Sequence, residues 1–207
     1  MELTTEQIQK NKEEFLDLVK SINREFDLEY LLKQLENSDF FEAPASTKYH
    51  DSYVGGLCNH SLIVYRTLKT LCEIFNVKVD PDSVKIVALF HDFSKMNYYT
   101  SEIKNKKVYC NSGSKHDSMG NYDWVSYTSY GVRPAEDRFI FGNHEVTSCF
   151  MINTFIPLTV EEFAAINHHH GSLGWDSAKD DITVIFTKYP LALLLHQADC
   201  LAAYNVV

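Results

Sequence analysis

The sequence predicts an all-α fold with one small insertion of irregular structure or a β-hairpin. Three observations support this prediction. Apolar residues recur at helical spacing, helix-start signals precede these stretches, and one polar segment, residues 104–131, interrupts them. The chain has 207 residues and 45% apolar composition, which is enough for one domain with a full core, so we treat residues 1–207 as a single domain.

Two helices are predicted at the N-terminal end, within residues 1–38. Thr4 or Thr5 can cap a helix that runs to about Ile22, and Asp27 can cap the next one. Apolar residues at helical spacing follow each cap: Phe15, Leu16, Val19 and Ile22, then Leu28, Leu31, Leu32 and Leu35.

The middle of the chain begins with a break. Residues 40–57 contain Gly55-Gly56 and other loop-forming residues, and a helix from about His60 to Phe75 follows. Asp80-Pro81 then provides a cap and a first-turn proline for another helix. That helix delivers His91 and Asp92 near its end.

Residues 104–131 have a different composition, polar and rich in Gly, Ser, Asn and Tyr. Two short stretches, Lys106–Tyr109 and Trp124–Tyr127, have strand-like patterns. We predict that this segment forms a hairpin flap over a pocket.

Helical patterns resume at about Gly142. Thr159 and Glu162 form a capping box for a short helix, which leads into three consecutive histidines at 168–170. Pro190 starts the last helix, which carries Asp199.

Metal-capable residues are spread over these elements: His60, His91, Asp92, His144, one of His168, His169 and His170, and Asp199. Imidazole and carboxylate together suit Mn, Fe, Co, Ni or Zn. A single histidine in an apolar helix is usually a core residue. However, Asp92 and Asp199 both follow apolar runs, where an unpaired carboxylate would cost several kcal/mol of desolvation. Two such carboxylates in one chain favour a metal site.

The composition limits the kinds of molecule that the protein can be expected to bind. The net charge of -9 does not suit a long nucleic acid, so we expect a small phosphorylated substrate such as a nucleotide. No stretch reaches the roughly 20 apolar residues that span a bilayer. The N-terminal residues show no signal-peptide pattern, and the five cysteines form no C-x-x-C pair, so we expect a cytoplasmic protein with reduced thiols.

Several segments resemble the HD-domain metal-dependent phosphohydrolases, an all-helical superfamily named for its His-Asp doublet. The resemblance covers residues from about 40 to 204, and it is closest to small HD hydrolases of phage and bacterial genomes and to the HD domain of a bacterial 3'-5' exoribonuclease. The matching segments are Phe40–His50, Gly55–Leu62, Leu89–Lys95, Gly142–Glu145, His169–Gly171 and Ala198–Asp199.

The resemblance implies a site for one or two divalent metal ions, with Mg added to the possible metals. His60, His91, Asp92 and Asp199 would hold the first ion, and His144 and His169 would hold the second, with Asp92 bridging. Helical spacing alone allows either His169 or His170 to face the site, and the family's H-x-G pattern selects His169. Activated water would then cleave a phosphoester or phosphoanhydride bond.

Other residues are candidates for contact with substrate. The family places a lysine at the position of Lys95, which together with Asp92 would be catalytic; the alternative is a surface lysine at a helix end. Lys48, His50, Arg66 and His170 are predicted to bind phosphate. Glu145 could accept a hydrogen bond beside the metal or act as a general base.

Three alternatives remain. A 3'-5' exonuclease on short single-stranded nucleic acid would need a basic, aromatic-lined groove. A di-iron oxygenase would hold two irons and consume O₂. A nucleotide sensor would bind without turnover. We also consider that the chain forms a homo-oligomer.

Overall fold

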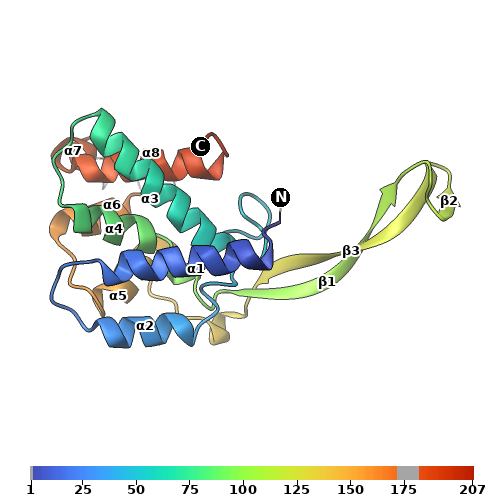
Figure 1. The fold of residues 1–207 in the computed structure, drawn as a ribbon, viewed down its shortest axis with the longest axis horizontal. Coiled ribbons are helices and arrows are strands. Elements are labelled where there is room, and N and C mark those ends of the chain that lie inside the picture. The colour runs from blue at the N-terminus through green and yellow to red at the C-terminus, as the bar shows by residue number, and fades with distance from the viewer. Residues whose placement is uncertain (1, 172–181) are drawn as a thin grey trace.

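The computed structural model describes residues 2–171 and 182–207, within which eight α-helices form a body and a long β-hairpin projects from it (Figure 1). The chain is thus mostly helical, with a small antiparallel sheet. The helices are α1 (Thr5–Lys20), α2 (Leu28–Glu36), α3 (Gly56–Ile74), α4 (Pro81–Phe90), α5 (His144–Asn153), α6 (Val160–Asn167), α7 (Ile182–Lys188) and α8 (Pro190–Ala203).

Side-chain caps fix where several helices begin. Thr4 and Gln7 form a capping box at the start of α1, and the Asp27 carboxylate accepts the Tyr30 N–H at the start of α2. Thr159 and Glu162 form a second capping box at α6. These caps agree with the sequence-based prediction to within a few residues.

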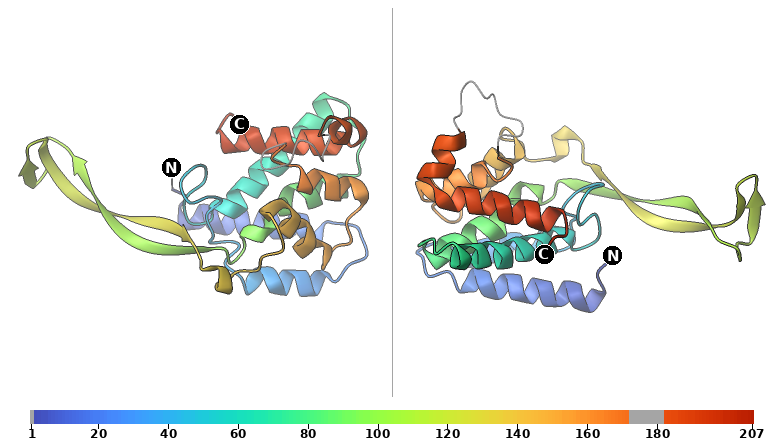
Figure 2. Two further views of the ribbon diagram at one scale, coloured as in Figure 1. Left: turned by 180° about the vertical axis from the view of Figure 1, so that it is seen from behind. Right: turned by 90° about the horizontal axis from the view of Figure 1, so that it is seen from above.

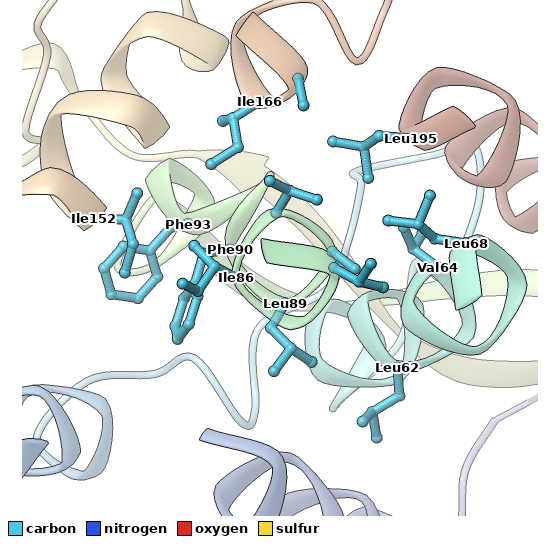
Figure 3. Close-up of a cluster of buried hydrophobic side chains, with 14 of the residues drawn as sticks. Leu62, Val64, Leu68, Ile86, Leu89, Phe90, Phe93, Ile152, Ile166 and Leu195 are labelled. Atoms are coloured by element: carbon cyan, nitrogen blue, oxygen red, sulfur yellow. The ribbon is translucent and has the colours of Figure 1, made fainter. Parts of the chain in front are cut away.

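Helix α4 is the centre of the core. Seven of its ten residues are buried, because α1, α3, α6 and α8 all pack against it. Figure 3 shows Ile86, Leu89 and Phe90 of this helix surrounded by apolar side chains from the neighbouring helices. Asp82 and Lys85, the charged residues of α4, pair with each other at 2.8 Å on the less buried side of the helix, and His91 and Asp92 lie at its C-terminal end.

The hairpin consists of β1 (Tyr99–Tyr109) and β3 (Gly120–Val132), with the short β2 (Lys115–Asp117) pairing β3 at the tip. Eleven registered pairs join β1 to β3, from Tyr99↔Val132 to Tyr109↔Tyr122. We call residues 99–132 the arm. Arg133 fixes its base, since its Nε–H donates to the Tyr99 carbonyl at 2.6 Å.

The arm corrects one prediction. The polar segment does form a hairpin, but its strands are longer than predicted and extend away from the helices rather than over a pocket (Figure 2). Alternation along a strand indicates its pairing but contains no information about the direction in which a hairpin leaves the body. Among the described residues, no helix is long and apolar enough to cross a membrane.

Candidate metal centre

The six predicted ligands lie in five helices or directly after them. His60 lies in the second turn of α3, His91 and Asp92 directly follow α4, and His144 is the first residue of α5. His169 follows α6, and Asp199 lies in α8. Five of the six are buried, and only His144 is partly exposed.

The two carboxylates are the meeting points of the histidines. Asp199 Oδ1 lies 2.9 Å from His60 Nε2 and 3.8 Å from His91 Nε2. Asp92 Oδ2 lies 3.4 Å from His91 Nε2. On the other side, Asp92 Oδ1 lies 3.7 Å from the Nε2 atoms of both His144 and His169. Asp92 therefore lies between two groups of imidazoles, as a bridging carboxylate would.

Three of the histidines present Nε2 to the cluster because another group faces their Nδ1. The carbonyl of Ala88 lies 2.8 Å from Nδ1 of His91, and that of Ile166 lies 2.6 Å from Nδ1 of His169. Nδ1 of His144 faces the Glu145 carboxylate at 3.2 Å. A second partner of this kind fixes the ring orientation of a metal-binding histidine.

Two atoms that face the interior of the cluster have no hydrogen-bond partner although they are buried: His91 Nε2 and Asp92 Oδ1. His60 Nδ1 and Asp51 Oδ2, 3.5 Å apart on the far side of the His60 ring, also have none. Leaving such groups unpaired is costly, so the two interior atoms call for a partner that protein atoms do not supply. A divalent cation satisfies both, and their atom types, nitrogen and carboxylate oxygen, are those that Mn, Fe, Co, Ni and Zn accept. The residues present therefore fit a metal ion.

The surroundings keep Asp92 ionised and favour neutral His144 and His169, which are the forms that bind a metal, whereas His60 favours its protonated form. Burial raises the pKa of Asp92, but the Lys95 and His91 charges outweigh it and hold the pKa well below its usual range. Burial lowers the pKa of His144 to about 3, and it also lowers that of His169. Burial opposes protonation of His60 as well, but the hydrogen bond to Asp199 and the nearby Asp51 carboxylate raise its pKa to about 9. A cation at His60 Nε2 would replace this proton.

Lys95 lies beside Asp92 because the chain turns sharply after α4. Helix α4 ends at Phe90, and a 3₁₀ turn, Phe93–Lys95, brings the Lys95 ammonium to 2.7 Å from Asp92 Oδ2. Burial lowers the pKa of Lys95, but the Asp92 charge more than offsets this and raises it. Lys95 is thus a partly buried cation at the cluster, with 13% of its side chain exposed, rather than a surface lysine.

The three consecutive histidines take three different roles. Nδ1 of His168 points away to the Ala164 carbonyl at 2.9 Å, and His169 joins the cluster. His170 lies at its open edge, 34% exposed, with Nε2 3.7 Å from Asp199 Oδ2. Glu145 connects His170 to the ligand His144, since its carboxylate faces Nδ1 of His170 at 3.0 Å and Nδ1 of His144 at 3.2 Å.

Sequence reasoning missed Asp51. Its Oδ2 lies 3.5 Å from Nδ1 of His60, and Tyr53 donates a hydrogen bond to its Oδ1. Asn59 in turn donates to Tyr53 at 3.0 Å, and Asn11 of α1 donates to Asn59 at 3.0 Å. A chain of hydrogen bonds therefore runs from α1 to Asp51, whose carboxylate faces the first ligand.

The backbone of Asp51 is in the left-handed region, with φ of 46°. Its carbonyl oxygen packs against Gly56, where an added Cβ would lie only 2.0 Å away. Only glycine fits at position 56, and Gly55 has φ of 80°, which also favours glycine, so both residues of the pair ahead of His60 are explained. The pair was the one available signal for this loop contact.

The predicted substrate contacts divide into two groups. His50 is close to the cluster, because its ring lies 4.7 Å from that of His60. Burial lowers the pKa of His50 to about 4. Lys48 is exposed on the same loop. Arg66 is used elsewhere, because its guanidinium pairs with Glu14 of α1 at 3.2 Å through Nε.

Comparison with known proteins gives one similarity. The chain is 38% identical over 66 residues to a dihydroneopterin 2',3'-cyclic phosphate phosphodiesterase of Methanocaldococcus jannaschii. The match covers 30% of this chain and 26% of that protein. No family model matches the chain, and no solved structure is significantly similar to it. The chain therefore combines a His/Asp cluster able to hold a metal with partial similarity to a phosphodiesterase.

Proposed function

We propose that this protein is a metal-dependent phosphohydrolase of the HD type, which cleaves a phosphoester or phosphoanhydride bond of a small nucleotide-like substrate. The observation that carries the proposal is the convergence of four Nε2 atoms on two buried carboxylates, with Asp92 between the two groups. The cluster contains three overlapping sets of three residues, and within each set the donor atoms lie within 4.8 Å of one another. This arrangement is consistent with one or two ions per chain.

A bound divalent ion would supply a water of lowered pKa and a Lewis acid for phosphate oxygens. The residues around it would do the rest. Lys95 holds a positive charge next to Asp92, where it can neutralise a phosphate oxygen as charge develops. His170 and Glu145 form the open edge, where a substrate oxygen would enter, and His50 and Lys48 lie on the loop beside His60.

The relative's name indicates the substrates to test first. That protein acts on a 2',3'-cyclic phosphate, so we extend this class to the present chain and propose cyclic phosphodiesters of nucleosides or related heterocycles. The same cluster would accept a linear phosphoester. A small substrate also agrees with the net charge of -9, which opposes long nucleic acids.

The test is product release from a panel of nucleotides, 2',3'- and 3',5'-cyclic nucleotides and short oligonucleotides, with Mn²⁺, Fe²⁺, Co²⁺ or Mg²⁺ added. We expect turnover of at least one small phosphoester, and a loss of about 10²-fold or more in Asp92→Ala. Asp117→Ala, in the arm, is the matched control and should leave turnover unchanged. Cleavage of the oligonucleotides alone would support the exonuclease alternative. Iron-dependent O₂ consumption without phosphate chemistry would support the oxygenase, and tight nucleotide binding without turnover would support the sensor.

A further inference from the structure

The arm is unusual because it has almost no contact with the body. Tyr99 is its single buried residue, and the remaining positions of β1 and β3 are partly or fully exposed. A two-stranded hairpin of this kind is at best marginally stable in water, and unpaired strand edges tend to find a partner. The arm therefore needs a partner that the body of the same chain does not provide (Figures 1 and 2).

Both faces of the arm expose apolar or aromatic side chains: Val108, Val125 and Tyr127 lie on one face, and the aromatic face, as we call it, is the other one, which contains Trp124. Directly paired residues share a face, so the register places Ile103, Trp124 and the pair Tyr109 and Tyr122 on the same side. Ile103 is 78% exposed and Trp124 is 50% exposed. Exposed large apolar residues that gather on one face mark an interaction surface.

A cleft of about 690 Å³ lies at the base of the arm, between the arm and the body. Its lining contains four carboxylates, Asp39, Glu42, Glu102 and Asp137, against one cation, Arg133. Val54, Ile103 and Tyr130 are among its apolar walls. Asp39 pairs with Arg133 and Glu102 pairs with Lys104, so Glu42 and Asp137 are the lining carboxylates without an ion pair among the described residues. The cleft is therefore acidic and has room for a large side chain.

The tip of the arm has exposed lysines, whose charge is opposite to that of the acidic cleft. It presents Lys106 and Lys115 to solvent beside its aromatic residues. The whole arm contains four lysines and three carboxylates, which gives it a net charge of +1. The total net charge is -9, so the rest of the chain has a net charge of -10. Opposite charges across an interface favour encounter and fix register.

We infer that the arm is a dimerisation element and that its partner is a second copy of this chain. Two arms related by a twofold axis and lying antiparallel place the tip of each next to the base of the other. A closed dimer of this kind uses the same surface patch on both copies. The aromatic face of each arm is covered, and each basic tip enters the acidic cleft of its partner. A nucleic acid is the less favourable occupant, because two of the four lysines, Lys104 and Lys107, are already paired with Glu102 and Asp117.

Sedimentation velocity of the full chain over a concentration series tests this inference. We expect a monomer–dimer equilibrium, with a dissociation constant at least about tenfold higher in Trp124→Ser. Ile74→Ser, which removes an exposed apolar residue at the far end of α3, is the matched control and should leave the constant unchanged. Circular dichroism checks that each variant is folded.

A charge exchange tests the contact between tip and cleft. Lys115→Glu and Asp137→Lys should each weaken the dimer, and the double variant should bind more tightly than either single one. A wild-type chain that stays monomeric at every concentration would overturn the inference, as would a dimer that Trp124→Ser does not weaken. Binding of a labelled single-stranded RNA by a monomer, lost in Trp124→Ser, would also overturn it and identify a nucleic-acid arm.

Discussion

The helical body and the arm break the rule of apolar inside and polar outside in opposite ways. The body buries charged residues, among them Asp92, Asp199 and Glu162, whereas the arm exposes apolar ones such as Ile103 and Trp124. In the body, each buried charge costs desolvation, so its position is fixed by several partners. In the arm, each exposed apolar residue leaves its stabilisation to a partner outside the chain. The first exception therefore points to chemistry, and the second to association.

The largest expected difference between the two regions concerns aromatic truncation. Phe15 is fully buried, with its ring 4.9 Å from that of Phe40 and 5.7 Å from that of Phe90. Phe15→Ala should lower the free energy of unfolding by about 3–5 kcal/mol, since it leaves a cavity in the core. Trp124→Ala, in the arm, should change it by less than about 0.5 kcal/mol when measured on monomeric protein. Urea unfolding followed by circular dichroism measures both, and equal losses would mean that the arm is part of the cooperative core.

A second contrast is between ion pairs. Arg24 donates to Ser83 at 3.0 Å and to Glu162 at 2.5 Å, and the Glu162 side chain is fully buried. Arg24→Ala should cost about 3 kcal/mol of unfolding free energy, because it leaves a buried carboxylate without its cation. Lys107→Ala, which removes an exposed pair with Asp117 in the arm, should have no measurable effect. A small loss in Arg24→Ala would show that water reaches Glu162.

A substitution beside the candidate metal centre should have a smaller effect, which we expect on metal affinity. Asp51→Asn keeps the size of the side chain but removes the charge that faces Nδ1 of His60. We expect Co²⁺ affinity, measured from its visible absorption, to fall about 10–100-fold, as for other groups that orient a ligand histidine. Tyr53→Phe should cause a smaller decrease, because it removes a hydrogen bond to Asp51 rather than the carboxylate itself.

Asp117→Asn, in the arm, is the matched control for Asp51→Asn and should leave the Co²⁺ affinity at the wild-type value. An Asp51→Asn variant with unchanged affinity and an unchanged Co²⁺ spectrum would refute a positioning role for Asp51. This experiment reads out metal binding directly, so it does not depend on which substrate the protein cleaves.

Local signals in the sequence predicted the body better than the arm or the loop. The cap at Asp27 and the capping box at Thr159 involve residues three positions apart, so a short stretch of sequence contains the whole interaction. The exact start of α3 was missed, since Gly55 caps it with φ of 80° rather than with a side chain. Helix α7 was also missed, because its β-branched residues favour a strand by propensity and tertiary packing overrides that preference.

The residues of the candidate site also divide into those that the sequence predicted and those that it did not. The six potential ligands could be named from residue types, apolar context and family resemblance, and the structure brings all six together. Asp51 could not be named, because a carboxylate nine residues before His60 contacts it only through the fold of the loop and the space left at Gly56. Arg66 was placed near phosphate by its distance along α3, but it lies six residues from His60 and pairs with Glu14 on α1.

The smallest effect concerns acid stability. Burial raises the pKa of Glu162, but hydrogen bonds from Arg24 and Ser83 outweigh burial and lower it below the usual value of 4.5. A carboxyl whose pKa is lower in the folded state stabilises the fold above its unfolded pKa, and this stabilisation is lost as the pH falls through the folded pKa. Wild-type protein should therefore lose this contribution below about pH 4.5, whereas Glu162→Gln, which cannot titrate, should not. Urea unfolding of both at a series of pH values should give free energies that differ by a constant amount above that pH and converge below it, because the pair is intact only while Glu162 is ionised. Curves that stay parallel down to pH 3 would show that Glu162 has the same pKa in the folded and unfolded chain, and the buried pair in the body would then be no more protected from solvent than the pairs of the arm.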